Sequence, residues 1–329
     1  MAIHQLKRYQ LGIETVRGTA VAATKKIAGA LDIALEDEWD RPEHTLGRQS
    51  LFEVGRATRV FQQVALKYSG PAYFEQLLWW LGMGLKGGVT GVQQVATAAY
   101  LWTYSPTLTT GDAPDSYTME YGDEQQNFES DYCIARSLTL AGAPREPWKI
   151  DVDIVGRKMT ESTVTAALTL VTGLEAPPFN KTNLYIDTTW AALGGAVKAA
   201  TLVNCSLTIP GFKALANADG NDYFSAYGIQ GRAITGKLTM LFNATGNVER
   251  DAYAARTARF VRLNCEGSLI EGAYNKRLRI DMCIEYTSFK VLGEWEGQTL
   301  VEADFVSVYD PTGTKEWEIT VQNALTTIP

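Results

Sequence analysis

Few residues of this 329-residue chain have the types and spacing that catalysis requires. The two histidines, His4 and His44, have no cysteine or carboxylate nearby at ligand spacing, and no GxSxG turn for a nucleophile occurs. A Ser–His triad or a histidine-based zinc site would depend on these two residues alone. The four cysteines form no CxxC pair and show no metal-site spacing, so we interpret them as buried thiols. They are Cys133, Cys205, Cys265 and Cys283.

Two glycine-rich segments partly match motifs that bind phosphate. Residues 231–237 (GRAITGK) have the glycine and lysine spacing of a phosphate loop, but Leu238 stands where a hydroxyl residue should hold magnesium. A strand pattern follows it, so no helix N-terminus would offer free N–H groups. Residues 82–87 (GMGLKG) satisfy GxGxxG, but they follow a helical segment instead of a strand. We expect a glycine C-cap and a flexible loop there.

Carboxylates offer two further candidates. Asp151 and Asp153 point the same way on a predicted strand and could form the acid pair of a glycosidase, although a solvated strand face is the favoured interpretation. Residues 217–222 (NADGND) could place a cation, but the closing glutamate of a calcium loop is missing, which indicates a turn. We therefore predict a non-enzymatic protein without catalytic, cofactor-binding or metal-binding residues.

The elements around these residues are predicted to be mainly strands. Hydrophobic residues make up 46% and charged residues 20%, which is enough to bury a sizeable core. Residues 149–154 and 277–282 alternate between apolar and polar side chains, as half-buried strands do. Residues 310–313 (DPTG) predict a turn between the last two strands. The two most helix-like segments are residues 71–81 and 247–256.

The chain also repeats itself. Residues 30–33 resemble residues 206–209, and Gly70 recurs as Gly246, both at an offset of 176. Residues 55–57 (GRA) recur at the same offset as residues 231–233. Further along, the offset becomes 151: residues 137–142 match 288–293, and residues 150–155 match 301–306. The order of the blocks is the same in both halves, which predicts an internal duplication.

This repeat predicts two tandem domains, each a β-sandwich or barrel-like unit with one packed α-helix. The first covers residues 1–172, including an N-terminal arm and a Gly-rich, then acidic, insertion at 82–131; the second covers residues 173–329. The change of offset from 176 to 151 assigns 25 extra residues to the first copy, where this insertion lies. The boundary is expected near residues 173–178, where consecutive prolines interrupt any element.

Charge and hydropathy exclude two classes of partner. The net charge is −7 and both halves are acidic, whereas a protein that binds nucleic acid needs a dense basic face. No run reaches the roughly 18 apolar residues of a membrane helix. Residues 1–8 lack the apolar core of a signal peptide. We therefore expect a soluble product that is made in a cytoplasm.

Residues 11–20 (LGIETVRGTA) resemble the opening of many tail tube proteins of siphophages, the bacteriophages with long non-contractile tails. Three later parts are similar to the same family: its central hairpin, a strand of its second half and its C-terminal end. They are residues 133–140 with 152–157, residues 236–242, and residues 309–313 through 319–323. Together these motifs span nearly the whole chain in the family's order.

The resemblance implies a structural virion protein that self-assembles into stacked rings around a channel for DNA ejection. Strands of neighbouring subunits would complete an inner β-barrel, so that no sheet edge stays free. Related tubes resemble rings of six tube folds, so a chain with two such folds predicts trimeric, pseudo-sixfold rings, with hexameric rings as the alternative. The family carries over no catalytic residues. Its expected partners are further copies of itself and the tape measure, tail terminator and tail-tip proteins.

In this family the protein is located in the virion tail, and it is assembled in the host bacterial cytoplasm. DNA would pass through the tube without specific binding, and an acidic chain suits a conduit that must not grip its cargo. We expect residues 1–26 and 37–49 to be ordered mainly by contacts between subunits or rings. Strands near residues 58–67 and 235–242 are the candidates for the channel wall.

Two other functions remain open from the sequence. One is another virion β-sandwich, such as a decoration protein or an adhesin, which predicts monomers or trimers that do not stack. The other is a carbohydrate-active β-sandwich enzyme, which predicts an aromatic-lined cleft with two close carboxylates.

Overall fold

The computed structural model describes residues 6–40, 57–107 and 109–328. Within them the fold is mainly β with two α-helices, as the sequence predicts. α1 (Leu77–Gly84) and α2 (Ala244–Ala254) lie close to the two helix-like segments. A short 3₁₀ turn covers Phe179–Lys181.

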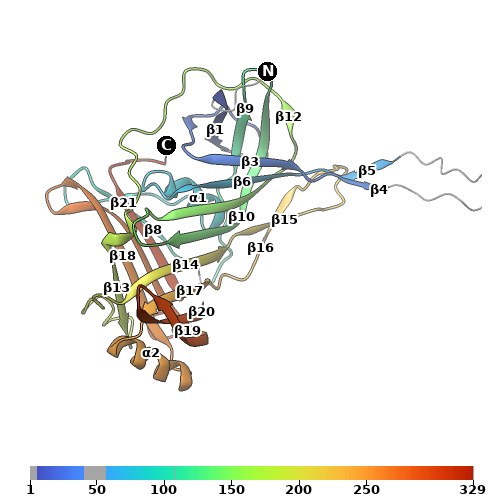
Figure 1. Cartoon of the computed structure of the whole chain (residues 1–329). Coiled ribbons are helices and arrows are strands. Elements are labelled where there is room, and N and C mark those ends of the chain that lie inside the picture. The colour runs from blue at the N-terminus through green and yellow to red at the C-terminus, as the bar shows by residue number, and fades with distance from the viewer. Residues whose placement is uncertain (1–5, 41–56, 108, 329) are drawn as a thin grey trace, which may run out of the picture.

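The largest layer is a sheet of eight antiparallel strands, named here the main sheet (Figure 1). Its order from one margin to the other is β3 (Ala30–Leu35), β6 (Val64–Pro71), β11 (Lys149–Gly156), β10 (Asn127–Gly142), β14 (Leu202–Pro210), β17 (Thr235–Leu241), β20 (Gln298–Ser307) and β19 (Tyr274–Trp295). Because β10 pairs with β14, this sheet runs through both halves of the chain. The division into domains at residue 172 stays a prediction.

Two smaller sheets share long strands with the main sheet. The first half of β19 pairs on both sides, in the order β13 (Thr182–Asp187), β18 (Arg259–Glu271), β19, β21 (Trp317–Asn323), β8 (Tyr100–Tyr104) and β7 (Val92–Gln93). The first half of β10 joins β2 (Lys25–Lys26), β1 (Arg8–Ile13), β9 (Tyr117–Gly122) and β12 (Thr160–Glu161). Residues 82–131 thus contribute several strands to these sheets.

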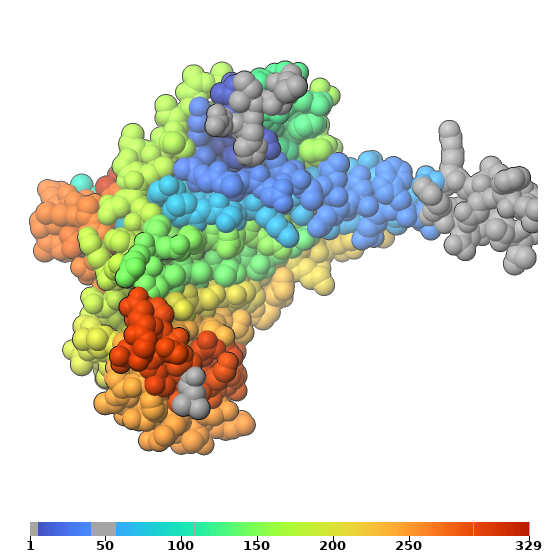
Figure 2. Space-filling view, in the orientation of Figure 1, coloured from blue at the N-terminus to red at the C-terminus, as the bar shows by residue number. Residues whose placement is uncertain are grey.

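Two hairpins extend from the sheets. β4 (Glu38–Asp40) pairs with β5 (Thr58–Phe61), and β15 (Phe212–Leu215) pairs with β16 (Ala226–Ile229). The β4–β5 hairpin projects sideways from the body of the molecule (Figure 2). It is connected to the other hairpin through Asp222, which accepts hydrogen bonds from Arg59 and Gln62. Residues 58–67 are therefore not one strand, because β5 ends at Phe61 and β6 begins at Val64.

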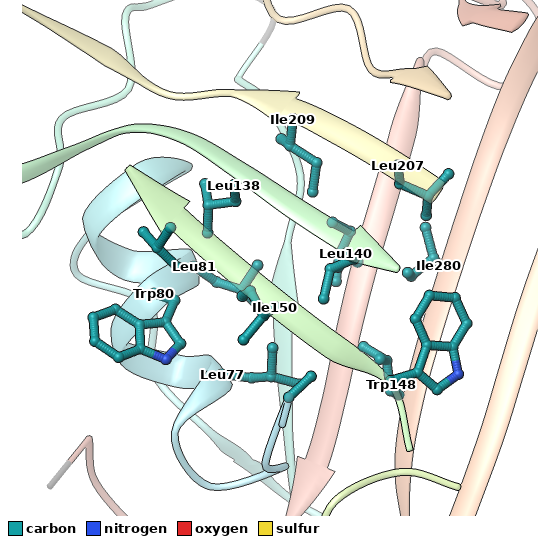
Figure 3. Close-up of a cluster of buried hydrophobic side chains, with 14 of the residues drawn as sticks. Leu77, Trp80, Leu81, Leu138, Leu140, Trp148, Ile150, Leu207, Ile209 and Ile280 are labelled. Atoms are coloured by element: carbon teal, nitrogen blue, oxygen red, sulfur yellow. The ribbon is translucent and has the colours of Figure 1, made fainter. Parts of the chain in front are cut away.

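Helix α1 is buried in the core against the main sheet (Figure 3). Gly84 lies so close to β10 that a Cβ there would overlap Leu138 Cδ1. The glycines of the GxGxxG match at Gly82 and Gly84 thus lie inside the helix, and the expected glycine C-cap is wrong. Gly84 lets the helix approach β10 closely, while Gly82 lies against the Asp115 side chain. The other glycine–lysine motif leads directly into β17, as expected.

Helix α2 lies beside β19 at the far end of the main sheet (Figure 1). It begins with an N-cap, because the Asn243 side chain accepts hydrogen bonds from the amides of Thr245 and Gly246. It is fixed to the sheet by a buried ion pair in which Arg259 donates to both oxygens of Glu249, at 2.9 and 2.6 Å. The Tyr286 hydroxyl also donates to Glu249.

Both halves of the chain repeat one pairing scheme. β3–β6–β11–β10 in the first half corresponds to β14–β17–β20–β19 in the second. β1–β9–β10 likewise corresponds to β13–β18–β19. Each half also places a hairpin between its first two main-sheet strands and a helix after the second. This repetition supports an internal duplication.

The register of the last hairpin agrees with the offset of 151. Ser137 pairs with Asp153 in the first half, and Ser288 pairs with Asp304 in the second. Each hairpin also has a register shift just before that serine, between Ala135 and Ser137 and between Tyr286 and Ser288. The two similar segments therefore share even the position of this register shift.

The offset of 176 needs a correction. In the first half of the chain, Asp153 pairs with Lys67, which in turn pairs with Asp32. In the second half, Asp304 pairs with Lys237, which in turn pairs with Ser206. Asp32 is thus the equivalent of Ser206, at an offset of 174. Residues 70 and 246 are not equivalent, since one lies in β6 and the other in α2. Residues 55 and 56 lie outside the described residues.

The N-terminal segment is part of the fold, and the expectation that subunit contacts order it is wrong for its described part. β1 pairs with β9 along its whole length, and Leu11 is fully buried. Buried Glu14 accepts hydrogen bonds from the Gly18 and Tyr132 amides and from two hydroxyls. Gly18 has a φ of 72°, which a glycine adopts without strain. The motif at residues 11–20 thus encodes a strand and a turn closed by a carboxylate.

Candidate assembly interface

The residues that could do chemistry are dispersed in the structure. Within the described part of the chain, no group of three or more His, Cys, Asp or Glu side chains could hold a metal ion. Both histidines lie outside that part. The four cysteines are free and buried, as expected. Burial raises the pKa of the Cys265 and Cys283 thiols to about 11, so both stay protonated near neutral pH.

The remaining candidates are surface features. Residues 217–222 form the connection between β15 and β16, where the Asn221 amide donates to Asp219 in a local turn, as predicted. Asp151 is exposed and Asp153 half-buried on the outer face of the main sheet, as favoured from the sequence. Four strands along the same sheet from β11, Glu302 and Asp304 occupy similar positions on β20. The carboxylates thus belong to an extended surface.

The outer face of the main sheet, named here the polar face, alternates with the buried face along every strand. Most of its solvent-accessible side chains are hydroxyls, carboxylates and lysines. They are Asp32, Lys67, Ser69, Ser137, Thr139, Lys149, Asp151, Asp153, Ser206, Thr208, Thr235, Lys237, Ser288, Lys290, Glu302 and Asp304, all exposed or half-buried. The opposite face carries the apolar side chains of the core (Figure 3).

The polar face repeats its chemistry. The row Lys67, Asp153, Ser137 recurs in the second half as Lys237, Asp304, Ser288, in the same cross-strand order. A lysine is therefore placed directly opposite an aspartate in each half, which is a favourable cross-strand pair. Lys237 lies 3.9 Å from Asp304 and 3.4 Å from Glu302.

These lysines do not form a basic patch. The polar face as defined has five carboxylates and four lysines, and each lysine has a carboxylate on a neighbouring strand or in the preceding turn. Arg59 belongs to the segment 58–67 that was predicted for the channel wall, but it lies on the β4–β5 hairpin and pairs with Asp222 at 2.9 Å. The face offers neutral hydroxyls and locally balanced charge.

Both margins of the main sheet are unpaired within the described chain. β3 pairs with β6 on one side only, and on its outer side the Ile33 amide donates to Asp32 Oδ1 of its own strand. At the other margin, β19 beyond Ile284 pairs with β20 only. Unpaired strand edges are templates for pairing with another chain.

Each margin also exposes apolar side chains. At the β3 margin Leu35 is 55% exposed and lines an open groove of about 590 Å³. The other apolar residues of this groove are Tyr9, Ile33, Tyr121, Phe128 and Met159. At the β19 margin Phe289 and Val291 are half-buried, and Phe289 stacks on Tyr253 of α2. The margins therefore combine free backbone groups with apolar surface.

Sequence reasoning did not identify these margins. The only available signal was the match between residues 137–142 and 288–293, which implies that the second segment needs a neighbour like that of the first.

A scan against protein-family models gave no match for this chain, and a search of curated proteins found no significant relative. In the described part of the chain, both α-helices are much shorter than the roughly 20 residues that a membrane span needs.

Proposed function

We propose that this chain is a structural virion protein of a siphophage tail, which self-assembles into stacked rings that form the tail tube. The observation that supports this best is the main sheet, with two different unpaired margins on either side of a polar face. Pairing of two unlike margins is a heterologous contact, and it closes into a ring when the rotation per subunit fits. A closed ring leaves no margin exposed.

The repeated pairing scheme supports the expected stoichiometry. Each chain supplies two copies of a four-stranded unit to the main sheet, so three chains supply six units. We propose trimeric rings with pseudo-sixfold symmetry, with six-chain rings as the alternative. The tape measure, tail terminator and tail-tip proteins are the further partners proposed, and the tail of the virion is the proposed location.

The polar face suits the wall of a DNA conduit. Each lysine–phosphate contact adds affinity through counterion release, so a wall of free lysines would hold DNA in place. Here each lysine has a carboxylate near it, and many of the remaining positions carry hydroxyls or small side chains such as Ala34 and Ala141. We propose that this face lines the channel and that the duplex slides along it without specific binding.

Contacts between successive rings would involve the β4–β5 hairpin. It extends away from the sheet (Figure 2), and Trp39 and Val60 on it are 57% and 56% exposed. Exposed large apolar residues on a projecting hairpin are typical of contact surfaces. Residues 41–56 lie outside the described part of the chain, so the prediction for residues 37–49 is tested only by experiment.

Negative-stain microscopy of the purified full chain at increasing concentration tests the proposal. We expect rings and tubes for the natural chain, and for Thr208→Lys, which adds a charge in the middle of the polar face. Leu35→Lys places the same charge at the β3 margin and should give folded monomers, since its side chain is already 55% exposed. Natural protein that stays monomeric, or forms trimers that never stack, would refute the tube and favour a decoration protein or an adhesin.

A further inference from the structure

One junction between two like units is visible inside the chain. The last strand of the first unit, β10, pairs with the first strand of the second unit, β14. On its buried side Leu138 is opposite Ile209 and Leu140 is opposite Leu207, and all four side chains are fully buried (Figure 3). On its polar side Thr139 is opposite Thr208, and their hydroxyl oxygens are 3.4 Å apart.

The two margins of the main sheet are the equivalents of this junction's two strands. β19 corresponds to β10 at the offset of 151, and β3 corresponds to β14 at the offset of 174. They lie at opposite ends of the eight strands and do not pair with each other in the described chain. Only a second copy of the chain can bring β19 beside β3.

We propose that the internal β10–β14 junction is the template for the contact between copies and fixes its register. This inference rests on the proposed function, and it names which residues meet. β19 of one copy pairs antiparallel with β3 of the next. Applying the two offsets to the internal pairs puts Lys290 opposite Ala34, Phe289 opposite Leu35 and Val291 opposite Ile33.

The apolar side chains fit this register. Phe289 and Val291 take the places of Leu138 and Leu140, and Leu35 and Ile33 take the places of the two β14 residues. The equivalents inside the chain are fully buried, whereas Leu35 is 55% exposed in one copy. Phe289 would cover Leu35 next to the groove that Leu35 lines. The exposed apolar surface at both margins is thus accounted for by one register.

The charges fit it as well. Lys290 is exposed and lies directly opposite Glu302 of its own chain, but Glu302 pairs with Lys237, and Lys290 forms no ion pair with a described residue. Opposite Ala34, it lies diagonal to Asp32 and Glu36 of the next copy, within reach of a long side chain. Glu36 already pairs with Arg136 of its own chain at 3.2 Å, while Asp32 has no ion pair in the described chain. Asp32 is therefore the main partner of Lys290.

Cysteine cross-linking tests the register. Residues directly opposite in an antiparallel pair have Cβ atoms about 4.5–5.5 Å apart, near disulfide distance, while diagonal residues are about 7–8 Å apart. The double variant Lys290→Cys with Ala34→Cys should therefore form intermolecular disulfides on mild oxidation. The matched control, Lys290→Cys with Asp32→Cys, places both thiols on the same face but out of register. The native cysteines are buried, so they give little background.

The expected result is a covalently closed ring from the in-register pair, three chains in size on a non-reducing gel, with at least tenfold less product from the control. Tubes whose in-register pair does not cross-link, or whose control pair cross-links as well, would overturn the register and leave the proposed function standing. Absence of any assembly by the natural chain would instead refute the proposed function.

Exchanging the charges of Lys290 and Asp32 tests the register if the cysteine variants do not assemble. Lys290→Asp alone should raise the concentration needed for ring formation about tenfold, and adding Asp32→Lys should restore it. Circular dichroism confirms folding of each variant. A double variant that assembles no better than the single one would count against the register.

Discussion

The ion pair between Glu249 and Arg259 offers a sharp test of how α2 is held on the sheet. Both side chains are buried, at 1% and 8% exposure, and two hydrogen bonds join them. Arg259→Met should destabilise the protein by about 3–5 kcal/mol, because it leaves the Glu249 charge buried without its partner. Replacing both residues, with Glu249→Leu added, should recover most of that loss, since well-packed apolar residues often replace a buried pair at little cost.

A matched control lies on the same helix. Arg250 forms an exposed pair with Asp251, at 51% and 70% exposure, so Arg250→Met should change stability by at most about 0.5 kcal/mol. Urea unfolding of the full chain, followed by circular dichroism, measures all four proteins. If Arg259→Met costs no more than Arg250→Met, the pair does not hold the helix in the way described.

Arg259→Met should also affect the assembly of rings. Tyr253 of α2 stacks on Phe289, with ring centroids 5.9 Å apart, and Phe289 lies at the β19 margin. Loosening α2 should therefore raise the protein concentration at which rings appear, while the double replacement should bring it back. A variant that is strongly destabilised but assembles at the natural concentration would separate α2 from the margin.

Three further predictions concern residues away from the margins. Glu14→Gln should lower the free energy of unfolding in urea by about 2 kcal/mol or more, because the buried carboxylate accepts several hydrogen bonds. The control Glu161→Gln, at an exposed position, should leave it unchanged, and equal effects of the two variants would contradict this role of Glu14. Burial alone would raise the pKa of Glu175, but hydrogen bonds from Ser268 and the charge of Lys276 lower it overall. The ionised carboxylate therefore stabilises the fold above about pH 4.3, and this contribution is lost as pH falls through the lowered pKa. The difference in unfolding free energy between the natural protein and Glu175→Gln should shrink on acidification, and a constant difference would refute the assignment. Gly84→Ala should lower the free energy of unfolding by about 1–3 kcal/mol, because its Cβ would overlap Leu138. Gly231→Ala, which has open space around it, should change thermal stability little. The reverse order would show that the helix does not pack as closely as described.

The sequence predicted the class of fold well because the signals for it are local. Alternation along residues 149–154 and 277–282 corresponds to strands β11 and β19, and residues 310–313 do form the turn before the last strand. The repeat of residues 137–142 at 288–293 also matches the register of the structure, bulge included. These features depend on residues near one another in the chain, which is why a pattern reveals them.

The register between strands that are distant in the chain was harder to predict from the sequence. The predicted offset of 176 differs by two residues from the 174 that follows from the pairing of β3 with β6 and of β14 with β17. A slip of two residues keeps every side chain on the same face, so the hydrophobic pattern is the same for both registers. Only the cross-strand partners distinguish them, and these are set by strands far away in sequence.

The candidate interface was decided by tertiary structure for the same reason. The residue pattern alone predicts that residues 137–140 and 288–291 are similar amphipathic strands. Tertiary structure decided that the first is buried beside β14, while the second ends the sheet with Phe289 and Val291 only half-buried. A strand's exposure depends on whether a neighbour lies beside it, and a chain with two like units has a neighbour inside itself for only one of them.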